Sequence, residues 1–299
     1  MDGVPKIVVT YTTLPDRYDL LHRSINSILG QTRPVDAIYL AIPKTCRRLN
    51  KVYTTLPKEI TDSCTVVECD IDYGPITKIY GALVSESDPE TIIISCDDDT
   101  IYDPMFIESI VKYADKYRDI AICGTGALIS RGVYLTAIRT TLKNFTWINP
   151  IVGLDVDPDT GRNVDLIFGV AGVLYRRKFF PEHNELHNEL FDISLRHDSL
   201  FHNDDVVISG YLSKRGIVRK VFHDIPPVVT EAAAAHALSG NVAVMLSRMQ
   251  LAIDQAKTHG LYPRTEPLSV SETVPGRALF LVILLITICF LIASLYITL

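Results

Sequence analysis

The chain has 299 residues, of which 47% are hydrophobic and 21% are charged, and this is enough for one large or two small globular domains. A formal net charge of -6 and the lack of a dense basic tract argue against binding to nucleic acid or another polyanion. The six cysteines form no CxxC pair, so reduced, mostly buried thiols are expected.

The first hundred residues alternate between strand-like and helix-like patterns. Helical spacing occurs in residues 18–29 and 76–84, and apolar runs typical of buried strands are residues 7–11, 37–42, 65–68 and 91–96. This alternation predicts βαβ units and a mainly parallel sheet flanked by helices, so the expected fold class is α/β.

Three consecutive carboxylates, Asp97, Asp98 and Asp99, follow the fourth apolar run. Open α/β sheets place their ligands at this end of the strands, and three neighbouring acids repel one another unless a cation shares their charge. Because hard divalent cations take carboxylate and phosphate oxygens, we expect a site for Mg²⁺ or Mn²⁺ and a diphosphate. The alternative is an acidic loop that caps the next helix, a role that Asp103 before Pro104 can fill alone.

The second half of the chain continues the mixed pattern. Helical spacing recurs in residues 105–117, 202–214 and 231–257, and strand character recurs in residues 120–123, 164–175 and 217–222. Gly169 and Gly172 interrupt the second of these strands, and a backbone can approach a ligand closely at such glycines. Residues 148–162 are rich in loop formers.

The C-terminal 22 residues, 278–299, carry no charge, and at about 1.5 Å per residue they would span a hydrocarbon core of roughly 30 Å. A segment that is apolar on every face has no polar side for water, which argues against a buried core helix. We therefore expect a C-terminal transmembrane helix, with residues 258–277 as a spacer. Arg277 on the domain side favours a membrane protein whose catalytic domain is cytosolic, and no signal peptide is evident.

Five segments occur in a characteristic order, ending with the acidic groups. They are residues 11–17 (YTTLPDR), 23–32 (RSINSILGQT), 73–78 (YGPITK), 97–99 (DDD) and 203–205 (NDD). Together they resemble a nucleotide-sugar glycosyltransferase of the GT-A fold, similar to the family 2-like enzymes of large DNA viruses and algae. The resemblance covers about residues 5–225 and implies a GT-A domain over residues 1–257.

The resemblance also implies roles for the matching residues. The donor nucleotide sugar would contact Thr13, Pro15, Arg17, Asp72, Gly74, Lys78, Asp97 and Asp98. The metal ion, Mn²⁺ or Mg²⁺, would be held by Asp99 and Asp97, with His223 as a third ligand. For Lys78 two interpretations stay open, because its ammonium can face a phosphate or lie on a solvated helix face.

Asp204 and Asp205 match the acidic pair that opens the acceptor-side helix of such enzymes, where the second acid would be the general base. Glu is more usual at the first position, so Asp204 departs from the pattern. The alternative is that both acids only stabilise the helix macrodipole.

The implied activity is metal-dependent, inverting transfer of a sugar from a nucleoside-diphosphate sugar to the hydroxyl of a glycan, lipid or protein. Two alternatives remain. One is a membrane-tethered sugar-binding or scaffold protein whose catalytic site has decayed. The other is a metallohydrolase, suggested by His183-Asn-Glu-Leu-His187, although a zincin helix needs Glu directly after the first His.

Overall fold

The structure is a computed structural model that describes residues 4–129, 135–138, 159–222, 224–226, 228–230 and 242–262. These residues belong to one unit, Met1–Arg264. No helix among them is long and apolar enough to cross a membrane. The predicted transmembrane helix, residues 263–277 of the predicted spacer and His223 lie outside the described residues.

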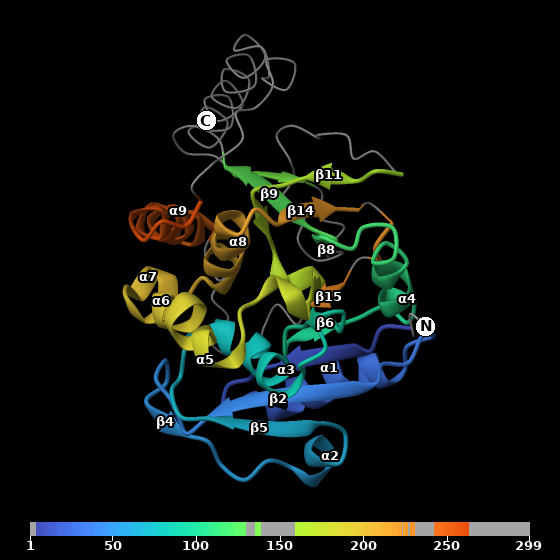
Figure 1. Ribbon diagram of the computed structural model, residues 1–299. Helices are drawn as coiled ribbons and strands as arrows, with labels where there is room; N and C mark the ends of the chain where they lie inside the picture. The colour runs from blue at the N-terminus through green and yellow to red at the C-terminus, as the bar shows by residue number, and fades with distance from the viewer. Residues whose placement is uncertain are drawn as a thin grey trace, which may run out of the picture. The chain divides into compact units, whose positions relative to one another are not determined.

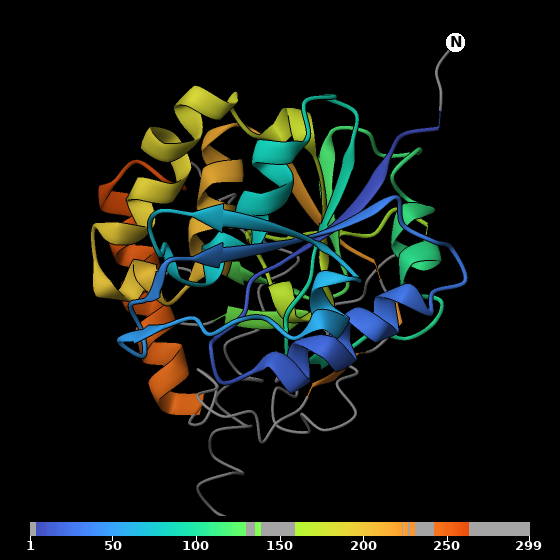
Figure 2. The same ribbon diagram turned by 90° about the horizontal axis from the view of Figure 1, so that it is seen from below.

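The N-terminal part of the chain forms four parallel strands, in the spatial order β5-β2-β1-β6. Their bounds are β1 (Ile7–Tyr11), β2 (Ala37–Pro43), β5 (Thr65–Cys69) and β6 (Ile92–Ser95). The sequence predicted all four to within one residue at each end. Alternate residues of β1 belong to different buried clusters, Val8 to one and Ile7 and Val9 to the other, because helices cover both faces of the sheet. Figure 2 shows the helices on both sides.

The helices of this part follow the apolar patterns. In α1 (Tyr18–Leu29) the buried residues recur at helical spacing, Leu21, Ile25 and Ile28, as predicted. The predicted helix over residues 76–84 is instead a 3-10 helix, η1 (Gly74–Ile79), followed by α3 (Tyr80–Ser85). The remaining short elements are α2 (Lys58–Thr61), β3 (Thr45–Cys46) and β4 (Lys51–Val52).

A second set of strands extends the same sheet beyond β6. Strand β13 (Val173–Arg176) is antiparallel to β6 on one side and to β8 (Ile120–Cys123) on the other. Strand β14 (Val218–Val221) is parallel to β8, and β11 (Arg162–Asn163) forms the edge. The eight-stranded sheet is therefore mixed, with two parallel blocks joined through β13. Figure 1 labels β5, β2 and β6 of the first block and β8 and β14 of the second.

The predicted strand over residues 164–175 is divided between two sheets. Its first part, β12 (Leu166–Ile167), pairs with β9 (Gly126–Ile129), which also pairs with β10 (Leu135–Ile138). A 3-10 turn, η2 (Gly169–Ala171), then redirects the chain into β13. Gly172 has φ +72° and the ring of Phe106 occupies the place where its side chain would lie, so the two glycines make the turn.

The predicted helix over residues 105–117 is shorter in the structure, α4 (Phe106–Val111). After Val111 the chain continues in turns, and these bring Tyr113 and Tyr117 against Phe222, with ring centroids at 3.7 and 5.4 Å. Asp103 precedes the helix, and its Oδ1 accepts a hydrogen bond from the N–H of Met105 at 2.8 Å.

Helices cover the C-terminal half of the sheet. Helix α8 (Asp204–Lys214) packs against β12, η1 and α9 (Val242–Thr258). The described part of the predicted helix over residues 231–257 begins at Val242. The smaller elements are η3 (Arg177–Phe179), α5 (His183–Leu186), a π-helix (His187–Phe191), α6 (Asp192–Leu195), α7 (Asp198–Phe201), β7 (Thr100–Ile101) and β15 (Val229–Thr230).

The strand order creates a switch point between β1 and β6. From β1 the chain adds β2 and β5 on one side, and it then crosses back to add β6 on the other side. Open α/β sheets bind ligands in the crevice at the carboxyl ends of two such strands. Here these ends lead into residues 12–17 after β1 and Asp97–Asp99 after β6.

Candidate functional site

Two of the three aspartates after β6 face the same arginine. Asp98 accepts hydrogen bonds from Thr13 Oγ1 at 2.6 Å and from Arg17 Nη1 at 3.0 Å, and Asp99 accepts one from Arg17 Nη1 at 3.2 Å. The extended strand ends at Ser95 and the chain turns at Asp98 and Asp99, so both side chains reach Arg17. Arg17 is held at the N-terminus of α1, so this helix carries the counter-charge.

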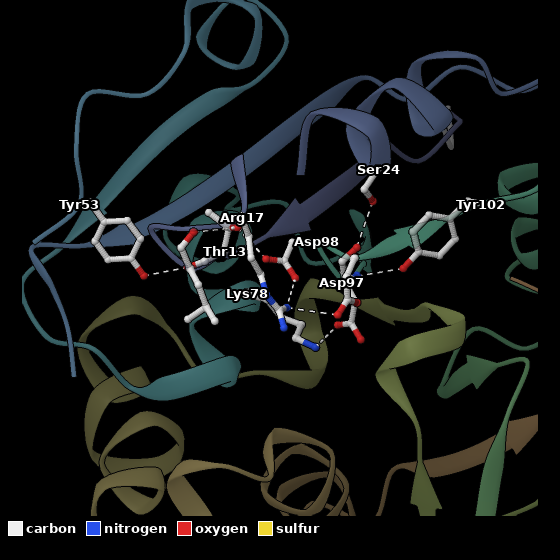
Figure 3. Close-up of polar contacts among 10 residues, drawn as sticks. Thr13, Arg17, Ser24, Tyr53, Lys78, Asp97, Asp98 and Tyr102 are labelled. Atoms are coloured by element: carbon white, nitrogen blue, oxygen red, sulfur yellow. Dashed lines mark hydrogen bonds and ion pairs between the residues drawn. The ribbon is translucent and has the colours of Figure 1, made fainter. Parts of the chain in front are cut away.

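The backbone of Asp97 is held from two sides (Figure 3). Its N–H donates to the hydroxyl of Tyr102 at 2.9 Å, and its carbonyl accepts from Ser24 Oγ at 3.0 Å. The loop after β1 is held in the same way, since Tyr53 donates its hydroxyl proton to the carbonyl of Thr13 at 2.8 Å. These bonds fix the loops that carry the acids before any ligand binds.

Lys78 lies between the two acidic groups. Its Nζ donates to Asp97 Oδ1 at 2.5 Å and forms an ion pair with Asp204 Oδ2 at 2.8 Å. The side chain is only 7% exposed, so the solvated helix face considered above was wrong. Burial lowers the pKa of this lysine, but the carboxylates of Asp204 and Asp97 outweigh burial and raise the pKa well above its usual value. Lys78 is therefore a charged, buried side chain that contacts both acidic groups.

Helix α8 supplies the second acidic group at its N-terminus. Asp204 reaches Lys78, and Asp205 Oδ1 accepts a hydrogen bond from the backbone N–H of Gly169 at 2.8 Å. A Cβ atom at Gly169 would lie 3.0 Å from Asp205 Oδ1 and 3.1 Å from Lys78 Nζ. The same position is 3.8 Å from Asp97 Oδ1, so η2, η1, β6 and α8 converge at this point.

The carboxyl groups carry more negative charge than their cations balance. Burial and the repulsion of Asp97 and Asp98 raise the pKa of Asp99 to about 7. Burial also raises the pKa of Asp98, although Arg17 opposes this shift. Burial and the adjacent Asp204 raise the pKa of Asp205 well above its usual value.

A metal ion suits the chemistry of this cluster. Among the described residues no group of three or more His, Cys, Asp or Glu side chains is arranged to hold a metal ion. However, Mg²⁺ and related ions are commonly held by one or two protein carboxylates together with substrate phosphates. Asp99 and Asp97 are carboxylates of this kind, and the repulsion that Asp97 and Asp98 add to the effect of burial on Asp99 is negative charge that a cation would share.

The remaining residues of the predicted donor pocket are Pro15, Asp72 and Gly74, and Gly74 opens η1. Asp72 accepts hydrogen bonds from the backbone N–H groups of Arg47 and Gly74, both at 2.7 Å. Gly74 has φ +78°, and a Cβ there would lie 2.2 Å from the carbonyl oxygen of Phe201. Pro15 is partly exposed between β1 and α1. The contacts described above thus connect Thr13, Arg17 and Lys78 to the aspartates, while Asp72 and Gly74 join η1 to its neighbours.

Several residues of the site were not identified from the sequence. Gly169 was expected to allow a close backbone approach, but its role as the donor to Asp205 needed the fold. Ser24, Tyr53 and Tyr102 had no distinguishing signal, because hydroxyls in α1 and in ordinary loops are common. The backbone of residues 183–191 is helical, and the side chains of His183 and His187 lie outside the described residues.

Comparison with known proteins adds little to this geometry. No family model matches the chain, and no curated protein matches it. Among solved structures, the chain is similar to the crystal structure of S. aureus TarS 1–349, with 12% sequence identity and a TM-score of 0.47. The match covers 76% of this chain and 60% of that one. At this TM-score the likeness decides neither the fold nor the activity.

Proposed function

We propose that this chain is a GT-A-type glycosyltransferase that moves a sugar from a nucleoside-diphosphate sugar to an acceptor hydroxyl. One observation carries the proposal. Two acidic groups, Asp97–Asp99 and Asp204–Asp205, lie on either side of the buried Lys78 at the switch point of an α/β sheet. Such a place suits a ligand with a diphosphate, and two separate acidic groups suit two separate tasks.

The donor side of the reaction belongs to the acids after β6. Asp99 and Asp97 would hold Mn²⁺ or Mg²⁺, which when bound neutralises charge on the departing diphosphate. Thr13 and Arg17 fix Asp98 and so keep the loop in place. Pro15, Asp72 and Gly74 border the same strand ends and would complete the nucleotide pocket.

The acceptor side belongs to Asp205. Its Oδ1 is fixed by the N–H of Gly169, which leaves Oδ2 to accept the proton of the attacking hydroxyl. Its raised pKa strengthens it as a base, and the ionised fraction then limits the rate at low pH. As the hydroxyl oxygen bonds to the sugar carbon, the bond to the diphosphate breaks, and this single displacement inverts the anomeric centre.

We also propose that the acceptor is a glycan, lipid or protein at a membrane surface, with the catalytic domain in the cytosol and residues 278–299 as the anchor. His223 would complete the metal shell. The membrane anchor and the His223 ligand are proposed from the sequence alone, because residues 278–299 and His223 lie outside the part of the chain that the structure describes.

The test is a donor screen with the purified chain. Nucleoside-diphosphate sugars are incubated with and without Mn²⁺, and release of nucleoside diphosphate and transfer to acceptors are measured. We expect metal-dependent release that a chelator abolishes and added Mn²⁺ restores. Asp205→Asn should remove transfer while donor binding persists, and Asp62→Asn, at an exposed ion pair with Lys58, is the matched control. Donor binding without any diphosphate release from the unaltered chain would favour a sugar-binding protein instead.

A further inference from the structure

Lys78 is the single side chain in the described site that contacts both acidic groups. Asp97 follows β6 and Asp204 opens α8, more than a hundred residues later in the chain. The lysine itself comes from η1, and its carbonyl accepts a hydrogen bond from Thr10 Oγ1 of β1 at 2.5 Å. The ammonium group of Lys78 thus connects η1 to the residues after β6 and to the start of α8.

The surroundings of the ammonium leave little room for a ligand. Two of its sides meet Asp97 and Asp204, and the backbone of Gly169 closes another, since even a Cβ there would lie 3.1 Å from Nζ. Figure 3 shows the Lys78 side chain reaching toward Asp97. Two of the three N–H groups of the ammonium already face carboxylates, and the side chain is only 7% exposed, so a direct contact with the donor is disfavoured.

The positive charge of Lys78 neutralises part of the negative charge of the carboxylates around it. Without Lys78, the carboxylates of Asp97, Asp204 and Asp205 would remain together in a largely buried place. Removing one partner of a buried ion pair is costly, because it leaves the other charge uncompensated. The ion pairs of Lys78 therefore contribute to holding the N-terminus of α8 against the acids after β6.

We propose that Lys78 is a positioning residue, which holds the N-terminus of α8 against the acids after β6 so that Asp205 faces the bound donor. In this arrangement Asp204 serves as the anchor for Lys78 and does not accept the proton of the acceptor. The inference rests on the proposed function for its kinetic consequence, but the link between Lys78 and Asp204 stands apart from it.

The first arm of the test uses kinetics. Lys78→Met should lower kcat about 100-fold, the size of effect expected when a reacting group is misplaced by about 1 Å. The KM for the donor should stay within about threefold of the value for the unaltered chain, because the contacts that bind the donor equally in the ground state and the transition state are unchanged. Lys78→Arg, which keeps the charge, should restore part of the turnover. Lys44→Met, at an exposed ion pair with Asp70, is the control and should change neither constant. A raised donor KM with unchanged kcat would mean that Lys78 binds the donor and would overturn the proposal.

The second arm does not need activity. Urea unfolding is measured for the unaltered chain, Lys78→Met, Asp204→Asn and the double variant. We expect coupling of at least about tenfold in the unfolding equilibrium constant, within the range found for residues in one ion-pair network. Asp204→Asn should partly offset the destabilisation by Lys78→Met, because it removes one of the uncompensated charges.

The two experiments distinguish a failure of the Lys78–Asp204 interaction from a failure of the proposed function. Additive effects in the urea cycle would show that Lys78 and Asp204 are not linked, whatever the enzyme does. A coupled cycle in a chain that transfers no sugar to any acceptor would instead contradict the proposed function and leave the link intact.

Discussion

The carboxyl group of Asp205 is buried beside Asp204, and both burial and that neighbour raise its pKa. The neutral form is therefore favoured in the folded protein. The stability that this preference contributes is fully present below the pKa of an unfolded aspartate, near 3.9, and is lost as the pH rises through the folded pKa. Above the pKa of an unfolded aspartate, the burial of Asp205 beside Asp204 thus weakens the fold.

Asp205→Asn should therefore be more stable than the unaltered chain at pH 8, because the amide replaces a carboxyl group whose ionised form is disfavoured by burial and by Asp204. The amide oxygen can still accept from the N–H of Gly169. Urea unfolding at pH 8 and at pH 5 measures the effect, and we expect the advantage to shrink on acidification. An equal or lower stability at pH 8 would contradict the buried, repelled state described for Asp205.

A second prediction concerns Gly169, whose backbone N–H donates a hydrogen bond to Asp205. In Gly169→Ala the new methyl group would meet Asp205 Oδ1 and Lys78 Nζ at about 3 Å, and both are ends of side chains that can shift. We expect turnover to fall about 10- to 100-fold, as for other small misplacements of reacting groups, with little change in stability. Gly30→Ala, whose nearest atom would be 3.4 Å away, is the matched control. Unchanged turnover in Gly169→Ala would argue against this geometry.

For individual residues, the sequence predicted which acids belong to the site but not which side chains these acids contact. A run of three aspartates after a buried strand is a strong local signal, and so is an acidic pair at a helix start. The pairing of Asp98 with Thr13 and of Lys78 with Asp204 could not be predicted, because it depends on how distant segments meet.

Among the elements, η1 depends on the glycine at its first position. Gly74 combines φ +78° with a backbone atom of Phe201 where a side chain would lie. Gly216 has a similar φ of +73° but open space around it. Alanine at Gly216 should therefore cost only the conformational penalty, about 1–2 kcal/mol.

Gly74→Ala should lower the free energy of unfolding by at least about 2 kcal/mol more than Gly216→Ala, because η1 must also separate from α7. Urea unfolding of the two variants gives the comparison. Equal losses at the two positions would mean that the close approach to Phe201 has no energetic weight.

Element prediction succeeded where the pattern was long and one-sided. The strands β1, β2, β5 and β6 are apolar runs bounded by turn residues, and α1 has a clear buried stripe. It failed for residues 164–175, which read as one strand and form parts of two sheets. Glycines can mark either a close approach or a turn, and only the packing of Phe106 against Gly172 decides which.

For the whole molecule, the described core closes before residue 265. The last buried members of the core are Leu261 and Tyr262, and the contacts divide the chain after Arg264. A chain that stops at Arg264 keeps every member of the described core and should therefore unfold cooperatively in urea. A chain that stops at residue 241 is the control, because it loses Met249, Ala252, Ile253 and Ala256 from the core and should be strongly destabilised. A chain that stops at Arg264 and shows no cooperative transition would contradict this division.

The α/β class and the parallel N-terminal block were predictable at this scale, because alternating strands and helices allow few arrangements. The antiparallel β13 between the two blocks was not, since nothing in a short apolar run fixes its direction or its neighbours.

Strand β13 also sets an order of events during synthesis. The partners β1, β2 and β5 of the first block are complete once the ribosome has passed Ser95, but one edge of β6 must wait for residues 173–176. At about 5–20 residues per second, this interval of about eighty residues lasts on the order of 4–16 s. During that time a hydrophobic strand edge is open to pairing with other chains. Slow-codon placement or chaperone supply in this window should therefore decide the yield of soluble protein more than changes elsewhere in the chain.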